Sequence, residues 1–203
     1  MNFEPEFVIV KARNATKFFT TYHATVCKGV AKILELNTNS MLQDGAFFGA
    51  AQAFDNTVFT VGNPDPGASN STNLSGTNYV AYAWHSVPGF SAFGSYQGNN
   101  DPDGPFVYTG LRVCMVLLKR TDSTGQWFLW DSTRQPANPV EIYLQPNQPD
   151  PENSTSDIKI DFLSNGFKLR GSHNDINGIG DYVFAAFAEN PFGGSNVSPS
   201  NAR

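Results

Sequence analysis

The sequence predicts an all-β fold, an antiparallel β-sandwich built from two pseudo-symmetric repeats. Three observations support this class: an internal repeat, short apolar runs bounded by turn residues, and frequent Gly and Pro. The 203 residues include 18 Gly, 13 Pro and 17 Phe, so turn residues interrupt an aromatic-rich chain throughout. This composition is typical of short strands joined by loops.

The repeat aligns the two halves of the chain at an offset of 108 positions. Residues 7–11 fall on residues 115–119, and residues 19–22 fall on residues 127–130. A period of about 100 residues is too long for solenoid or propeller units and suits two copies of a small β module. We expect one compact unit made of a first repeat at 1–88, a second repeat at 89–192 with leading strands within 90–109, and a C-terminal tail at 193–203.

Two further matches follow the same repeat. The offset of 108 also places Leu34 on Ile142, and a five-residue length change in a loop then places Tyr79 on Tyr182. Because surface loops tolerate insertions, this change of offset is expected between two copies of one module.

The predicted strands are apolar or alternating runs of about five to eight residues. The continuously apolar runs Phe7 to Val10 and Cys114 to Leu118 are expected to be central strands. Helix is not expected over 25–36, because Gly29 interrupts it and the matching segment holds two prolines. The predicted strands lie at 6–12, 17–22, 31–37, 57–61, 78–85, 90–96, 105–109, 113–120, 126–131, 140–145, 157–162, 166–170 and 181–188.

Composition excludes several classes of partner. Charged residues make up 15% of the chain, and 13 Lys and Arg against 18 Asp and Glu leave a net charge of −5, which argues against nucleic acid. No apolar run is long enough to span a bilayer and the start lacks a leader pattern, so we expect no membrane insertion. The two cysteines, Cys27 and Cys114, do not match in the repeat and are expected to be free thiols.

Several strings resemble a known group of proteins. The runs "TNYVAYAW" (77–84), "GQWFLWDSTR" (125–134), "DFLSNGFKLR" (161–170) and "AFAENPF" (186–192) are similar to duplicated β-rich domains of virion appendage proteins in tailed bacteriophages, especially marine ones. The resemblance covers nearly all of residues 3–203. It implies a lectin-like sandwich, of concanavalin or jelly-roll type, in a tail fibre or related surface protein.

This resemblance sets the functional expectation. It implies a structural virion protein but no known ligand. We expect this protein to be assembled in the host cytoplasm, to form homo-oligomers, to contact other virion proteins and to contribute to attachment to host-surface glycans. The alternatives are a head-decoration or purely architectural virion protein, and a glycan-degrading enzyme domain. The segment Phe90 to Tyr108 has no counterpart before Phe3, so a strand of a neighbouring subunit could fill that gap. An open edge at Phe7 to Lys11 would then favour oligomerisation.

Glycan contact is expected from aromatic rings that lie next to polar groups, because sugar rings stack on aromatic side chains while polar neighbours bond their hydroxyls. Aromatics shared by both copies are expected in the core, and those in unmatched segments at the surface. For Trp130 and Asp131 a structural role is also open, with the ring inward and the carboxylate capping a turn. The candidate contacts are Tyr96, Tyr108, Tyr22, His23, Trp130 and Asp131.

Enzymatic chemistry has little support in the residue pattern. A concanavalin-like glucanase needs two carboxylates about 5 Å apart, commonly as Glu-x-Asp-x-x-Glu, and no such spacing occurs. The three histidines have no nucleophile at a readable spacing. We therefore expect no enzyme. The separations among Asp131, Asp157, Asp161 and Glu189 would decide the hydrolase alternative.

Cofactor and metal sites are also not expected. Asn99 to Gly104 resembles the first half of a calcium loop, but the twelfth position is Gly110 rather than a bidentate Glu. Pro102 inside this run favours a tight turn. The sequence holds no His and Cys cluster with zinc spacing.

Overall fold

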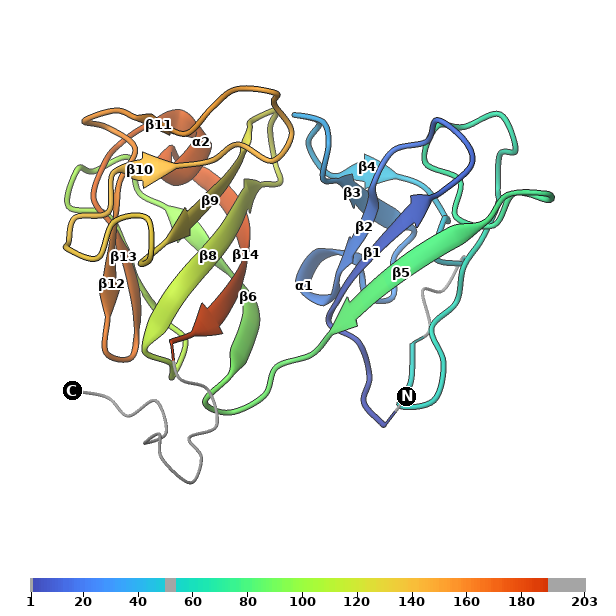
Figure 1. Ribbon diagram of the computed structural model, residues 1–203, viewed down its shortest axis with the longest axis horizontal. Helices are drawn as coiled ribbons and strands as arrows, with labels where there is room; N and C mark the ends of the chain where they lie inside the picture. Colours follow the sequence, from blue (N-terminus) through green and yellow to red (C-terminus); the bar gives the residue numbers. More distant parts are fainter. Residues whose placement is uncertain (1, 50–53, 190–203) are drawn as a thin grey trace. The chain divides into compact units, whose positions relative to one another are not determined.

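The computed structural model describes residues 2–49 and 54–189, and their regular secondary structure is mostly β-strands in antiparallel sheets. The chain divides into two compact units, which we call unit 1 (Met1–His85) and unit 2 (Ser86–Arg203). Each unit forms its own sheet or sheets (Figure 1). Each unit also has its own hydrophobic core. The all-β antiparallel expectation is thus confirmed. That the repeats form one compact body stays a prediction, and the tail at 193–203 lies outside the described residues.

Unit 1 contains one five-stranded sheet with the order β4-β3-β2-β1-β5. Its core packs Val8 and Val10 of β1 against Tyr22, Ile33 and Phe48. β1 is central, as expected, because β2 and β5 pair with its two edges. The expected open edge at this strand is therefore wrong, and β5 ends the sheet instead. The strands are β1 (Phe7–Ala12), β2 (Thr20–His23), β3 (Lys32–Glu35), β4 (Gln43–Asp44) and β5 (Tyr79–Trp84).

Unit 2 contains a four-stranded sheet, β6-β14-β8-β9, a three-stranded sheet, β12-β13-β7, and the small pair β10-β11 (Figure 1). Its core takes side chains from both larger sheets, among them Leu118, Trp130, Phe167 and Phe184. The assignment to a concanavalin or jelly-roll sandwich stays a prediction. The strands are β6 (Ser91–Gly98), β7 (Phe106–Tyr108), β8 (Val113–Arg120), β9 (Trp127–Asp131), β10 (Ile142–Tyr143), β11 (Asn153–Ser154), β12 (Ile160–Leu163), β13 (Gly166–Leu169) and β14 (Gly180–Ala188).

Most predicted strands are present, and the exceptions have local causes. The run at 57–61 is not a strand, because the Asp55 carboxylate accepts the N–H groups of Thr57 (2.6 Å) and Val58 (2.8 Å) and closes a turn. The two-residue strands β4 and β11 are too short to show a side-chain period, so the sequence did not indicate them.

The two described helices are single turns, α1 (Ala24–Cys27) and α2 (Asn174–Asn177). The ring nitrogen Nδ1 of His23 accepts the N–H of Thr25 at the start of α1. Gly29 follows at φ +76°, a left-handed conformation that a residue with Cβ adopts at a cost. The expectation of no helix over 25–36 therefore holds apart from this one turn. Neither described helix combines the length and apolar character needed to cross a membrane.

The central strands of the two units have the same pairing register. Val8 of β1 pairs with Tyr22 of β2 and Ala83 of β5. Val116 of β8 pairs with Trp130 of β9 and Ala186 of β14. Each unit 2 partner lies 108 positions, or for β14 103 positions, after its unit 1 counterpart. These are the same two offsets that align the sequences.

The outer strands match as well, at an offset of 110. Lys32 pairs with Asp44 and Ile33 with Gln43 in unit 1, whereas Ile142 pairs with Ser154 and Tyr143 with Asn153 in unit 2. The hydrogen bonds agree, because the N–H of Phe19 donates to Asn37 Oδ1 and the N–H of Trp127 donates to Asn147 Oδ1. The pairing therefore places Leu34 on Leu144, two positions beyond the ungapped alignment with Ile142.

A lysine at the same place in each unit bonds a backbone carbonyl. Lys11 Nζ donates to Lys17 O at 2.8 Å, and Lys119 Nζ donates to Gly125 O at 2.9 Å. The Lys119 side chain is fully buried, and burial lowers its pKa to about 8 although the Asp175 carboxylate opposes the shift.

Tyr22 and Trp130, which match between the units, each bury a polar atom without a hydrogen-bond partner among the described residues. We expect Tyr22→Phe to leave the free energy of unfolding unchanged or raise it by about 1 kcal/mol, because it removes a hydroxyl that is desolvated without compensation. Tyr182→Phe is the matched control, because the Tyr182 hydroxyl donates to Asn174 O at 2.6 Å. This variant should lose about 1 kcal/mol in urea unfolding. Equal losses in both variants would contradict the expectation.

Lys119 predicts a pH dependence of stability. Its folded-state pKa of about 8 lies below the usual 10.5, so between these values the unfolded chain binds more protons and stability rises with pH. Relative to Lys119→Met, the wild type should therefore gain on the order of 1 kcal/mol per pH unit from pH 8 to pH 10. Urea unfolding of both proteins measures this difference, in which the tyrosine and cysteine titrations cancel. A difference that stays constant with pH would contradict the lowered pKa of Lys119.

Candidate functional site

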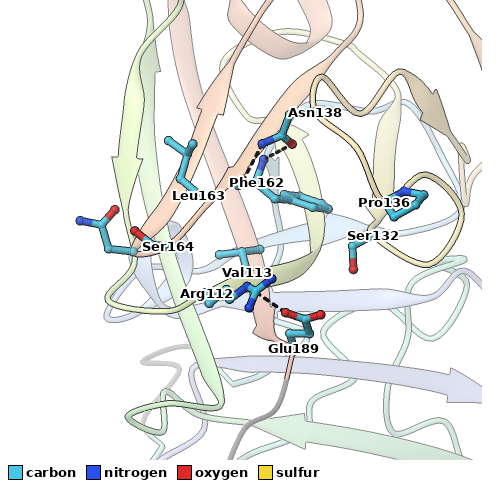
Figure 2. Close-up of a pocket in the computed structure, with 10 residues that line it drawn as sticks. Arg112, Val113, Ser132, Pro136, Asn138, Phe162, Leu163, Ser164 and Glu189 are labelled. Carbon is cyan, nitrogen blue, oxygen red and sulfur yellow. Dashed lines mark hydrogen bonds and ion pairs between the residues drawn. The ribbon is translucent and has the colours of Figure 1, made fainter. Parts of the chain in front are cut away.

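The candidate site is a pocket of about 720 Å³ at one end of unit 2, which we call the Phe162 pocket (Figure 2). Its walls come from the start of β8, the loop after β9, the β12–β13 turn and the end of β14. This volume lies within the range of small-molecule sites. The residues used below are Arg112, Val113, Ser132, Pro136, Asn138, Phe162 and Glu189.

A β-bulge positions the ion pair in this pocket. The pairing of β14 with β8 shifts after Phe187, so Cys114 has no partner on β14 and Ala188 pairs with Val113. The N–H of Glu189 then donates to Arg112 O at 3.1 Å, and Arg112 Nε lies 2.8 Å from Glu189 Oε2. Bulges commonly redirect side chains beside functional sites. Both charged side chains remain partly exposed, at 33% and 41%.

The side-chain amide of Asn138 fixes the backbone that carries the aromatic ring of the pocket. Asn138 Nδ2 donates to Phe162 O at 2.8 Å, and the N–H of Phe162 donates to Asn138 Oδ1 at 2.9 Å. These two hydrogen bonds fix the backbone of β12 at the pocket. Figure 2 shows the half-buried ring of Phe162 directed toward the side where Ser132 and Pro136 lie. The pocket thus combines one flat apolar ring with a cation, a carboxylate and a hydroxyl.

The pocket lies where the matching positions of the two units differ. Arg112 matches Glu4, and Pro136 matches Lys28, by the offset of the central strands. In unit 1 these two positions form their own ion pair, Lys28 Nζ to Glu4 Oε1 at 2.6 Å. The arrangement of Arg112 with Glu189 is therefore specific to unit 2.

Three of the predicted contact residues lie in the cores. Tyr22 and Trp130 have no exposed surface, and His23 is 1% exposed. Asp131 accepts the N–H of Arg134 at 2.8 Å and pairs with its guanidinium at 3.1 Å. The alternative interpretation, an inward Trp130 and a turn-capping Asp131, is thus confirmed.

Two other predicted contacts lie together in a smaller groove of about 380 Å³ between β6 and β7, which we call the Tyr108 groove. Tyr108 is 70% exposed, and Phe106, on the same face of β7, is 46% exposed. Tyr96 is more enclosed, because its ring stacks on Tyr182 at 4.9 Å and its hydroxyl donates to Ile176 O. Burial raises the pKa of Tyr96 well above its usual value.

The carboxylates singled out for hydrolysis have other partners. Asp157 accepts the N–H of Ser172 at 2.8 Å, and Asp161 pairs with Arg170 at 3.0 Å. Glu189 is the one of the four carboxylates that lines the Phe162 pocket, where Arg112 holds it. That the protein is not an enzyme stays a prediction.

The calcium-like run forms a tight turn, as interpreted. The N–H of Asp101 donates to Asn99 Oδ1 at 3.0 Å, and the N–H of Asp103 donates to Asp101 Oδ1 at 2.8 Å. Across residues 2–49 and 54–189 there is no group of three metal-ligating side chains. Cys27 and Cys114 are free thiols, as expected.

The sequence did not indicate the pocket residues Arg112 and Phe162 as a site. A bulge has no sequence period, so the pairing of Arg112 with Glu189 could not be inferred from spacing. Phe162 lies in a predicted strand, and its sequence context does not distinguish it from other strand aromatics. The available signal was the difference between matching positions, such as Arg112 and Glu4.

The exposed ion pair should matter little for stability. We expect Arg112→Met and Glu189→Gln to lower the free energy of unfolding by less than about 1 kcal/mol, because surface ion pairs contribute little. Arg120→Met should lose about 3 kcal/mol, because Arg120 is buried and its guanidinium bonds Asp122 and the Asn174 carbonyl. Urea unfolding of the three variants tests this order. A large loss at Arg112 would make the pair structural.

The model of a domain of unknown function, DUF7483, matches the chain over residues 1–191. No curated protein and no solved structure matches the chain significantly. The family description names neither a phage nor a lectin, so the resemblance to virion appendages stays a prediction. Because the matched region covers most of the sequence, the chain belongs to the DUF7483 family.

Proposed function

We propose that this protein is a saccharide-binding β module made of two copies of one fold, of which the second copy carries the binding pocket. In keeping with the resemblance to appendage proteins, the module belongs to the surface of a tailed-phage virion and contributes to attachment to host glycans. The Phe162 pocket is the observation that carries the saccharide assignment.

The duplication is supported by strand pairing. Five strands of unit 1 and five of unit 2 pair in the same order, at offsets of 108, 110 and 103 that change only between strands. A slip of one residue moves every side chain of a strand to the opposite face, so each sheet fixes its own register. Two unrelated sheets would have little reason to share the same register at constant sequence offsets. The lysine-to-carbonyl bonds of Lys11 and Lys119 repeat as well.

The saccharide assignment follows from the chemistry of the pocket. A sugar ring has an apolar C–H face, which suits the Phe162 ring, and a rim of hydroxyls that both donate and accept. Arg112 can donate charge-assisted hydrogen bonds to this rim, and Glu189 can accept them. Fixed charged and aromatic groups in a concave pocket give orientation and specificity.

Binding is favoured over glycan hydrolysis by the pocket lining. Hydrolysis needs two carboxylates that flank the scissile bond, whereas Glu189 is the one carboxylate among the described lining residues. A single pocket of this kind binds weakly, and several copies on one particle would bind a glycan surface with higher avidity through multivalency.

Glycan-array binding of the purified chain tests the proposal, followed by calorimetry on the best ligand. We expect Phe162→Ala and Arg112→Met to raise the Kd at least tenfold, about 1.4 kcal/mol, because they remove the stacking surface and the charged donor. Thermal unfolding confirms that each variant is folded.

Tyr108→Ala is the matched control, because it removes an exposed aromatic ring outside the pocket. It should bind like the wild type. Loss of binding in this variant alone would move the site to the Tyr108 groove, and binding to no glycan at all would refute the saccharide assignment. An architectural or head-decoration role would then be the better account of the resemblance.

A further inference from the structure

The matching strands β5 and β14 differ in their neighbours. β14 pairs with β8 on one edge and with β6 on the other. β5 is the last strand of its sheet and, among the described residues, pairs with β1 alone (Figure 1). In unit 1 no described strand pairs with the edge that β6 occupies in unit 2.

Backbone hydrogen-bonding groups point out from this edge. The N–H of Arg13 donates to Asn78 O at 2.8 Å, which fixes the hydrogen-bonded pairs of the β1–β5 ladder. Because such pairs alternate in antiparallel sheets, Tyr79, Ala81 and Ala83 direct their N–H and C=O groups away from β1. In unit 2 the matching alternation serves β6, since the N–H of Ala188 donates to Phe90 O at 2.9 Å.

β5 lacks the features that usually protect an edge strand. Its six residues contain no charge and no proline, and its register with β1 does not shift between Phe7 and Ala12. Proteins commonly block exposed edges with such features or with very short strands. The strand at the other end of the sheet, β4, has only two residues. Tyr82 on β5 is 52% exposed.

We propose that a second copy of this chain covers the edge, so that two β5 strands pair antiparallel about a two-fold axis at Ala81. In this register Ala81 faces its own symmetry mate and Tyr79 faces Ala83, a large side chain opposite a small one. No charges oppose one another, because the strand is neutral. The two unit 1 sheets join into one continuous sheet, and the two-fold axis closes the assembly as a dimer.

The expected dimer is concentration-dependent. Pairing of two six-residue strands buries less than the roughly 1,200 Å² of a stable interface, so subunits should exchange with free monomer. The dimer does not depend on the saccharide assignment. If both hold, each dimer carries two Phe162 pockets, which raises the avidity for a glycan surface.

Sedimentation velocity of the full chain over a wide concentration range tests the dimer, using variants at Ala81. Ala81→Pro removes an outward donor that β1 does not use, and a proline is tolerated there on an edge strand. Ala81→Lys places two like charges opposite each other. We expect both variants to weaken dimerisation at least tenfold with unchanged circular dichroism. Ala81→Thr, a strand-forming uncharged control, should dimerise like the wild type.

Cysteine cross-linking tests the register. Under mild oxidation Ala81→Cys should form a disulfide-linked dimer, because symmetry mates in a hydrogen-bonded pair lie about 5.5 Å apart at Cα. Val80→Cys should not, because its residue faces Tyr82. A monomer at every concentration, or a dimer insensitive to Ala81→Pro and Ala81→Lys, overturns the proposal. A monomer that binds a synthetic Ser91–Gly98 peptide also overturns it and assigns the edge to a strand of another kind.

Discussion

Backbone pairing of one central strand with two neighbours is the constraint on which each unit depends. β1 and β8 each hydrogen-bond on both edges, so the register on one side fixes which side chains the other side can meet. A slip of one residue would turn Val8 or Val116 out of the core, at a cost of roughly 1.5–3 kcal/mol for each apolar side chain. Strand register is therefore the feature of each unit that is least free to change.

Freedom for change remains where pairing ends. The bulge at Cys114 lies at the end of the β8–β14 pairing, where β8 begins and β14 ends. It can redirect Arg112 without disturbing the core pairs further along β8. The other divergence is the missing counterpart of β6, which leaves one edge of unit 1 without a partner among the described residues. Two units with the same strand register and unlike surfaces would allow one chain to combine the Phe162 pocket of unit 2 with the proposed self-association edge of unit 1.

Much of the scaffold could be predicted from the sequence, because apolar runs and their repetition report burial directly. The run at 113–120 coincides with β8, and the offsets of 108 and 103 are those of the strand pairs. The two-position error at Leu34 arose because apolar residues on alternate positions align nearly as well after a slip of two. The shared position of Tyr22 and Trp130 already indicated a core role, and both side chains are fully buried. The Phe162 pocket could not be predicted, because the bulge that brings Arg112 to Glu189 has no sequence period.

The placement of the two cysteines has a practical consequence. Each unit contains one thiol, Cys27 in unit 1 and Cys114 in unit 2, and neither is in a disulfide. Cys27 is completely buried, and burial raises its pKa to about 12, so alkylating reagents cannot reach a reactive thiolate until unit 1 opens. Cys114 is half-buried with a raised pKa and will react on its own time course. The native chain thus carries an internal reporter in each unit, from which the independence of their unfolding can be read by mass spectrometry.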